Sequence, residues 1–167
     1  MPLVTFRSCA LHSSMSLKVN LRHLAAHDLH LKDELPVADL DLGLTDEVIH
    51  AQKPLHYDLS IEAVTNGILV QGRLSLTLDC QCVRCLKSFE YTVQLPNWTL
   101  HLPLEGEEKV PIDNDYVDLT PFVREDMLLE FPQHPLCRPD CTGLSKKERD
   151  QAKSGPSAWK ALDKFSL

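Results

Sequence analysis

The stretch PLHYDLSIEAVTNGILVQGRLSLTLD, residues 54–79, decides the fold of this chain. Apolar and polar side chains alternate through residues 55–63 and again through residues 68–78, which is the period of a strand with one buried face. Asn66-Gly67 stands between the two runs, and this dipeptide is favoured in a two-residue type I′ turn because both positions tolerate positive φ. The stretch therefore predicts an antiparallel hairpin with one apolar face.

A third alternating run follows, and its phase changes in the middle. The apolar positions are 89, 91, 93 and 95 before Pro96-Asn97, and 98, 100, 102 and 104 after it. A proline within a strand is typical of a bulge or an edge bend, so we interpret the run as one long strand that bends there. The three runs together predict an antiparallel meander. Residues 16–50 carry weaker patterns, from which we expect one or two short strands.

A helix is predicted after the meander, with Thr120 as its N-cap and Pro121 at its first position. Pro132 and Pro135 end it. Its apolar side chains lie on two faces, which predicts that it is covered on both sides: Val123, Met127 and Phe131 on one face, Phe122 and Leu129 on the other. The expected fold class is α+β, an antiparallel β meander with a covering helix and a Cys-rich C-terminal segment.

Charge divides the chain into regions. The 167 residues carry a formal net charge of −7, which argues against a protein that holds nucleic acid over its whole surface. Residues 143–167 are basic, whereas the segment 105–118 is acidic and loop-like. We predict a flexible leader at residues 1–15, with Met15 as a possible true start, a folded domain at 16–144, and a basic, partly helical tail at 145–167.

The expected location is the cytoplasm. No apolar run approaches the roughly 20 residues that span a bilayer, and the first residues lack the apolar core of a signal peptide. We therefore expect no membrane association. Cysteines stay reduced in the cytoplasm, so closely spaced cysteines are interpreted as metal ligands before they are interpreted as disulfides.

Two short-spaced cysteine pairs are the clearest chemical signal. Cys82 and Cys85 enclose two residues, and Cys137 and Cys141 enclose three. Such pairs can complete a tetrahedron around one ion, which predicts a structural zinc site, and four free, partly buried thiols are the alternative. Four thiolates leave no open position for water, so a catalytic metal is not expected. Cys80 continues the inward phase of its strand and is expected in the core, and His134 is a reserve ligand.

Other functions have weaker support. The chain contains no G-x-S-x-G, P-loop, dinucleotide fingerprint or H-E-x-x-H motif. Glu125-Asp126 is interpreted as a helix-surface pair rather than a general acid and base, and a metal-dependent enzyme is the remaining catalytic alternative. A zinc-bearing RNA-binding adaptor is the other alternative. Either a basic patch near the cysteines or dispersed solubilising charges would account for the remaining bases: Arg73, Arg84, Lys87, Arg138 and the tail lysines.

Three blocks resemble the YceD family. LDCQCVRCLKSF, residues 78–89, resembles its C-x-x-C-L knuckle, and DLTPFVREDMLL, residues 118–129, resembles its D-L-x-P-x-V-R-E-D-x-L-L element. The third block, PLCRPDCTGL at residues 135–144, resembles its closing P-L-C-x-x-D-C-x-G-L. The resemblance covers residues 16–144. Ser145 stands where many members carry a further cysteine, and no second C-x-x-C-G motif follows.

The resemblance implies a bacterial, non-enzymatic protein of ribosome biogenesis that is needed for the accumulation of large-subunit ribosomal RNA. Carried over by position, the metal cysteines would be Cys82, Cys85, Cys137 and Cys141. The expected partner is a basic ribosomal protein or the pre-ribosomal large subunit, since the body of the chain is acidic. The basic tail is the expected place for a contact with ribosomal RNA. The candidate binding residues are the charged residues of the second block: Asp118, Arg124, Glu125 and Asp126.

Overall fold

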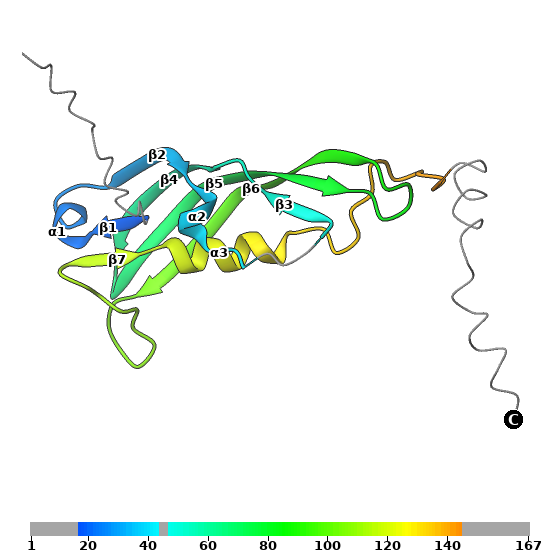
Figure 1. Ribbon diagram of the computed structural model, residues 1–167. Coiled ribbons are helices and arrows are strands. Elements are labelled where there is room, and N and C mark those ends of the chain that lie inside the picture. The colour runs from blue at the N-terminus through cyan, green and yellow to red at the C-terminus, as the bar shows by residue number, and fades with distance from the viewer. Residues whose placement is uncertain (1–16, 44–46, 145–167) are drawn as a thin grey trace, which may run out of the picture.

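A computed structural model describes residues 17–43 and 47–144. The main sheet is built around the long strand β5 (Gly67–Gln81), which pairs antiparallel with β4 (Leu55–Val64) along one edge and with β6 (Ser88–Pro103) along the other. This is the predicted meander, and Figure 1 shows it running the length of the molecule. β2 (Leu29–Leu35) extends the sheet beyond β4, and β3 (Ile49–Ala51) pairs with β5 past the end of β4.

The turn between β4 and β5 lies one residue earlier than predicted. Val64 pairs with Gly67, so Thr65 and Asn66 form the two-residue loop. Of these two only Asn66 has a positive φ, 62°, which excludes the type I′ turn because that turn needs positive φ at both positions. Gly67 is therefore not part of the turn, and glycine is needed there for another reason. A Cβ there would lie 2.6 Å from the carbonyl oxygen of Leu102, so glycine lets β6 approach.

The predicted bulge in the third run is confirmed. Gly72 pairs with Trp98 and Leu74 pairs with Leu95, so two residues of β6, Pro96 and Asn97, stand opposite one residue of β5. The extra residue reverses the alternation within β6. As a result, side chains on both sides of the bulge face the same apolar layer, and β6 remains one strand over its whole length.

The apolar layer lies between the sheet and α3 (Thr120–Leu129), which runs along one face of the sheet in Figure 1. A two-stranded ribbon of β1 (Lys18–Asn20) and β7 (Tyr116–Asp118) covers the same layer, together with the single-turn helices α1 (Leu21–Leu24) and α2 (Val37–Leu40). Many of its side chains are almost fully buried, among them Leu55, Leu59, Ile61, Leu74, Leu76, Leu78, Val123 and Met127.

Two predictions about α3 were wrong in detail. Its N-cap is Leu119 rather than Thr120, because the Thr120 hydroxyl is used elsewhere: its Oγ1 accepts a hydrogen bond of 2.9 Å from the backbone N–H of Leu17. This bond fastens the start of the described chain to the start of the helix. The second predicted face is only partly covered, since Phe122 packs against the core whereas Leu129 is 81% exposed.

The early part of the chain holds more structure than expected. β1, β2 and β3 all precede residue 52, where one or two short strands were predicted. The acidic loop is shorter than predicted, since β7 occupies residues 116–118. The proposed leader and the proposed basic tail lie outside the described residues. No helix in the described ranges combines the length and the apolar character needed to cross a membrane.

Gly72 generates a test of the sheet geometry. Its φ is +158°, and a Cβ at this position would lie 2.1 Å from the carbonyl oxygen of Asp58 on β4. Gly72→Ala should therefore lower the free energy of unfolding by about 3 kcal/mol or more, measured by urea denaturation.

Gly106→Ala is the control, because a Cβ there meets nothing within 4 Å although φ is +92°. We expect a loss of about 1 kcal/mol for this variant from the backbone conformation alone. Equal losses in the two variants would contradict the close approach of β4 and β5.

Candidate metal centre

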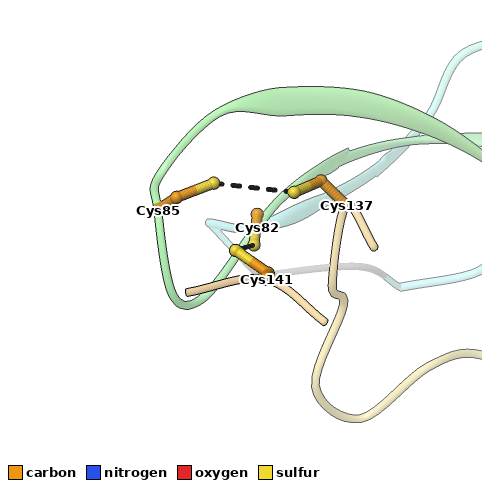
Figure 2. A group of neighbouring side chains, drawn as sticks. All are labelled: Cys82, Cys85, Cys137 and Cys141. Carbon is orange, nitrogen blue, oxygen red and sulfur yellow. Dashed lines mark hydrogen bonds between the residues drawn. The ribbon is translucent and has the colours of Figure 1, made fainter. Parts of the chain in front are cut away.

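Four cysteines from two distant segments meet at one end of the sheet. Cys82 and Cys85 lie in the loop that joins β5 to β6, and Cys137 and Cys141 lie on the segment that follows α3 (Figure 2). All four sulfur atoms lie within 4.8 Å of one another, and they form the one such group among the described residues that could hold a metal ion. The structure therefore brings together the two pairs that the sequence singled out.

Backbone hydrogen bonds fix the shape of the first pair. The N–H of Leu86 donates to the carbonyl oxygen of Cys82 at 2.8 Å, and the N–H of Cys82 donates to that of Lys87 at 2.9 Å. The resulting knuckle requires Leu86 to adopt a φ of 60°. The second segment is joined to it because the N–H of Val83 donates to the carbonyl oxygen of Pro135 at 3.0 Å.

The sulfur separations fit a tetrahedral ion. Four thiolates with metal–sulfur bonds of about 2.3 Å form a tetrahedron whose edges are about 3.8 Å. Cys82 Sγ lies 3.8 Å from Cys141 Sγ, and Cys85 Sγ lies 3.6 Å from Cys137 Sγ. Each of these close pairs joins one cysteine of the knuckle to one of the later segment, so an ion at the centre would link the two segments.

Backbone N–H groups favour a thiolate at Cys82. The N–H of Cys137 contributes most, those of Cys85 and Arg84 add to it, and together they outweigh burial and lower the pKa of Cys82 to about 6. By contrast, hydrogen bonding from Cys85 and burial, followed by the nearby sulfurs of Cys141 and Cys82, raise the pKa of Cys137 to about 12. A cation among the sulfurs would instead lower the pKa of Cys137, since a coordinating thiol gives up its proton.

The cluster is a closed one. Cys82 and Cys141 are buried, and Cys85 and Cys137 are partly buried. Four sulfur ligands fill a tetrahedral shell, so this arrangement is suited to holding segments together rather than to activating water. Cys80 is 2% exposed and belongs to the core, as predicted. The side chain of His134 is exposed and is not part of the cluster.

Basic side chains surround the cysteines. Arg84 Nη1 donates to the carbonyl oxygen of Cys141 at 3.0 Å. Lys87 and Arg138 line a hollow of about 590 Å³ beside Cys85, Cys137 and Cys141. Sequence reasoning placed Arg73 in the same patch as an option, but it lies far along β5.

Arg73 instead belongs to an ion cluster on the sheet. Its Nη2 lies 2.9 Å from Asp58 Oδ2, and Lys32 Nζ lies 3.3 Å from the same oxygen. His30 Nε2 approaches the other oxygen at 2.8 Å. The hydrogen bond from Arg73 is the main cause that lowers the pKa of Asp58, with His30 and Lys32 adding to it. Arg73 and Lys32 therefore share one carboxylate within the sheet, which offsets one of their two positive charges.

The four predicted binding residues lie on or near α3, but two of them have internal partners. Asp118 Oδ1 accepts a hydrogen bond of 2.8 Å from the N–H of Thr120, and Asp126 Oδ2 accepts one of 2.6 Å from Trp98 Nε1. Arg124 is partly buried, and its Nε has no hydrogen-bond partner among the described residues. Glu125 is exposed. These contacts give Asp118 and Asp126 structural roles, and a binding role for the set stays a prediction.

Sequence reasoning missed the bond between Trp98 and Asp126 and the unusual backbone of Leu86. The sequence held a clue to the hydrogen bond, because a largely buried indole N–H needs an acceptor and Asp126 is the acid beside the inward face of the helix. It held no clue to the backbone of Leu86, because only the closed knuckle requires a positive φ at that residue.

A family model described as "Large ribosomal RNA subunit accumulation protein YceD" matches residues 70–166, which include all four cysteines and more than half of the chain. Uncharacterized proteins of Mycobacterium tuberculosis and Mycobacterium bovis are each 32% identical over 111 residues, which cover 62% of this chain and 54% of the relative. A protein of Mycobacterium leprae with the same description is 32% identical over 111 residues, covering 62% of this chain and 51% of the relative. The chain spans about half the length of these curated relatives. No solved structure matches it.

The first prediction from the site concerns metal content. The purified chain should hold one metal ion, and Cys82→Ser and Cys137→Ser should each lose most of it, because each removes one corner of the tetrahedron. Elemental analysis measures the content. Cys80→Ala is the matched control, since it removes a neighbouring buried sulfur outside the cluster and should leave the metal content unchanged. Equal metal in all four proteins would contradict the site.

The second prediction concerns Asp126. A hydrogen bond to a charged group contributes about 1.5 to 3 kcal/mol, so Asp126→Ala and Trp98→Phe should each destabilise the fold. In a double-mutant cycle the two should couple by about 1 kcal/mol or more, measured by urea denaturation. Glu125→Ala, on the exposed face next to Asp126, should change the free energy of unfolding by less than about 0.5 kcal/mol. Additive effects would show that the bond does not stabilise the fold.

Proposed function

Because the chain belongs to the YceD family of large ribosomal RNA subunit accumulation proteins, we propose that it is a non-catalytic factor in bacterial ribosome biogenesis. In this proposal it supports the synthesis, processing or stability of large-subunit ribosomal RNA in the cytoplasm. The family match is the observation that carries the proposal, since it spans the β5–β6 hairpin, α3 and both cysteine pairs. A small rigid sheet with a closed metal centre suits a binding factor better than an enzyme.

The proposed metal is zinc in a structural role. A tetrahedral set of four sulfur ligands is typical of zinc or of iron–sulfur chemistry, and one ion with sulfur edges near 3.8 Å suits zinc. Its ligands Cys82 and Cys85 come from the main sheet, and Cys137 and Cys141 come from the segment after the helix. Zinc would therefore fasten the later segment to the end of the sheet.

The proposed partner is a basic ribosomal protein, alone or within the pre-ribosomal large subunit. Residues 1–142 carry a net charge of −10, and such an acidic body attracts a basic partner over a long range. The loop between β6 and β7 concentrates this charge at one end of the molecule, where Glu105, Glu107 and Glu108 are exposed (Figure 1). An acidic end of this kind favours protein recognition over nucleic acid at that place.

A zinc-bearing RNA-binding adaptor is the second candidate function, and one observation favours it. Lys87 and Arg138 are exposed beside the cysteines, at the opposite end of the sheet from the acidic loop. The two candidates use different ends of the molecule and are compatible with each other. A metal-dependent enzyme has less support, because the four sulfurs leave no ligand position for a substrate or water.

The proposed function predicts that depletion of the protein lowers large-subunit ribosomal RNA relative to small-subunit ribosomal RNA, measured on total RNA by electrophoresis. The wild-type chain should restore the ratio. A variant with Glu105, Glu107 and Glu108 all changed to Lys should restore it poorly and should no longer recover a basic ribosomal protein in pull-downs. Changing the same residues to Asp preserves the charge and is the control. An unchanged ratio after depletion would contradict the proposed function.

A further inference from the structure

The tip of the cysteine knuckle exposes apolar side chains. Val83 is 43% exposed and Leu86 is 55% exposed, and both stand in the loop that carries Cys82 and Cys85. Leu86 also holds a φ of 60°, which glycine adopts without strain and which is unfavourable for a bulky residue. The backbone of Leu86 helps to form the knuckle, but its exposed side chain contributes nothing evident to folding. Such residues cluster at sites of function, so the tip is a candidate contact surface.

Unneutralised positive charge lies next to this apolar tip. Lys87 and Arg138 are exposed, and neither forms an ion pair with any residue that the structure describes. On the sheet, by contrast, Arg73 and Lys32 share Asp58, and Lys53 pairs with Glu90 at 2.6 Å. The two free bases border the hollow of about 590 Å³, whose other lining includes Thr142 and Gly143.

The bases at the knuckle lie at one end of the sheet. The opposite end of the sheet carries the acidic loop, and a 15-residue strand such as β5 separates the two ends by about 50 Å. Among the described residues, the exposed acids of the loop and the bases Lys87 and Arg138 therefore lie at opposite ends of the sheet.

We propose that the knuckle end binds single-stranded RNA. Lys87 and Arg138 would contact consecutive phosphates, and an unstacked base would pack against Leu86 and Val83 at the tip. Sequence-tolerant binding of single strands combines a positive surface for the backbone with side-chain surfaces for the bases, most often aromatic rings. At this tip the aliphatic side chains of Leu86 and Val83 would take the place of such rings. The inference rests on the proposed function only for the identity of the strand, which would be a precursor of large-subunit ribosomal RNA.

The basic side chains near the cysteines have a competing explanation, which is that they offset the negative charge of the thiolates. Four thiolates around a divalent ion carry a net charge of −2, and Arg84, Lys87 and Arg138 lie close enough to offset it. The knuckle accounts for the positive φ of Leu86, and this explanation accounts for the positive charge. Neither accounts for an exposed leucine side chain at a position where glycine would be unstrained. The sign of the charge also disfavours a basic protein at this end, and an acidic peptide is the protein partner that would fit.

The experiment measures binding of the purified full-length chain to a fluorescently labelled, single-stranded RNA of fifteen nucleotides and mixed sequence by anisotropy. The double variant Lys87→Glu/Arg138→Glu should weaken binding at least tenfold and reduce the slope of log K against log salt by about 1.4, since two phosphate contacts are lost. Lys109→Glu makes the same type of charge change in the acidic loop and should weaken binding less than twofold.

Leu86→Gly separates a contact role from a structural one. Glycine accepts the positive φ without strain, so this variant should melt at the same temperature as the wild type or higher, with the same metal content. It should nevertheless bind the RNA at least threefold more weakly, because the apolar contact is gone. Undiminished binding by Leu86→Gly would overturn the proposed base contact.

Three further results would overturn the proposal: no measurable binding of RNA by the wild type, binding unaffected by the double variant, or binding weakened equally by Lys109→Glu. Capture of an acidic peptide rather than RNA by a photocrosslinker at Val83 would overturn it in favour of a protein partner. These outcomes are distinct from a failure of the proposed function. If the double variant restores large-subunit ribosomal RNA fully in depleted cells, the RNA site is wrong and the ribosomal role stands.

Discussion

The pairing of β5 with β6 constrains the rest of this structure, because it extends, with one bulge at Pro96-Asn97, from Gly67 to Gln81 on one strand and from Ser88 to Pro103 on the other. A ribbon of this length has two ends that cannot touch. The cysteine knuckle is the turn at one end, and the acidic loop follows the last pair at the other. The hydrogen bonds between β5 and β6 therefore keep the cysteines and bases at one end apart from the acidic side chains at the other.

The segment after β6 brings the chain back to the cysteine knuckle. After β6 the chain returns through β7 and α3 to the knuckle, so Cys137 and Cys141 arrive beside Cys82 and Cys85. Backbone hydrogen bonds such as that from Val83 to Pro135 hold the two segments in place, and a metal at the sulfurs would add to them. The helix that carries the chain back is itself fixed by Asp126 to Trp98 and by Thr120 to Leu17. The return of the chain through β7 and α3 therefore both covers the core and brings the second cysteine pair to the first.

Much of this path could be read from periodicity. Alternation predicted β4, β5 and β6, and the change of phase at Pro96-Asn97 predicted the bulge, because a strand's side chains must keep facing one apolar layer. The weaker segments were predicted less well. β1, β2 and β3 are held by pairing with distant strands rather than by their own pattern. Gly67 belongs to the sheet, where it pairs with Val64 and Pro103, so the turn lies at Thr65-Asn66.

The spacing of the cysteines was sufficient to nominate all four, since short-spaced pairs are a local property of the chain. The sequence by itself determined the meander, the phase of its core and the identity of the candidate ligands. Only the tertiary structure decided that the sulfurs of Cys82 and Cys141 lie 3.8 Å apart, that Leu86 has a positive φ, and that Asp126 faces Trp98. The reason is physical: these features depend on contacts between residues far apart along the chain, which local patterns of hydrophobicity and spacing do not encode.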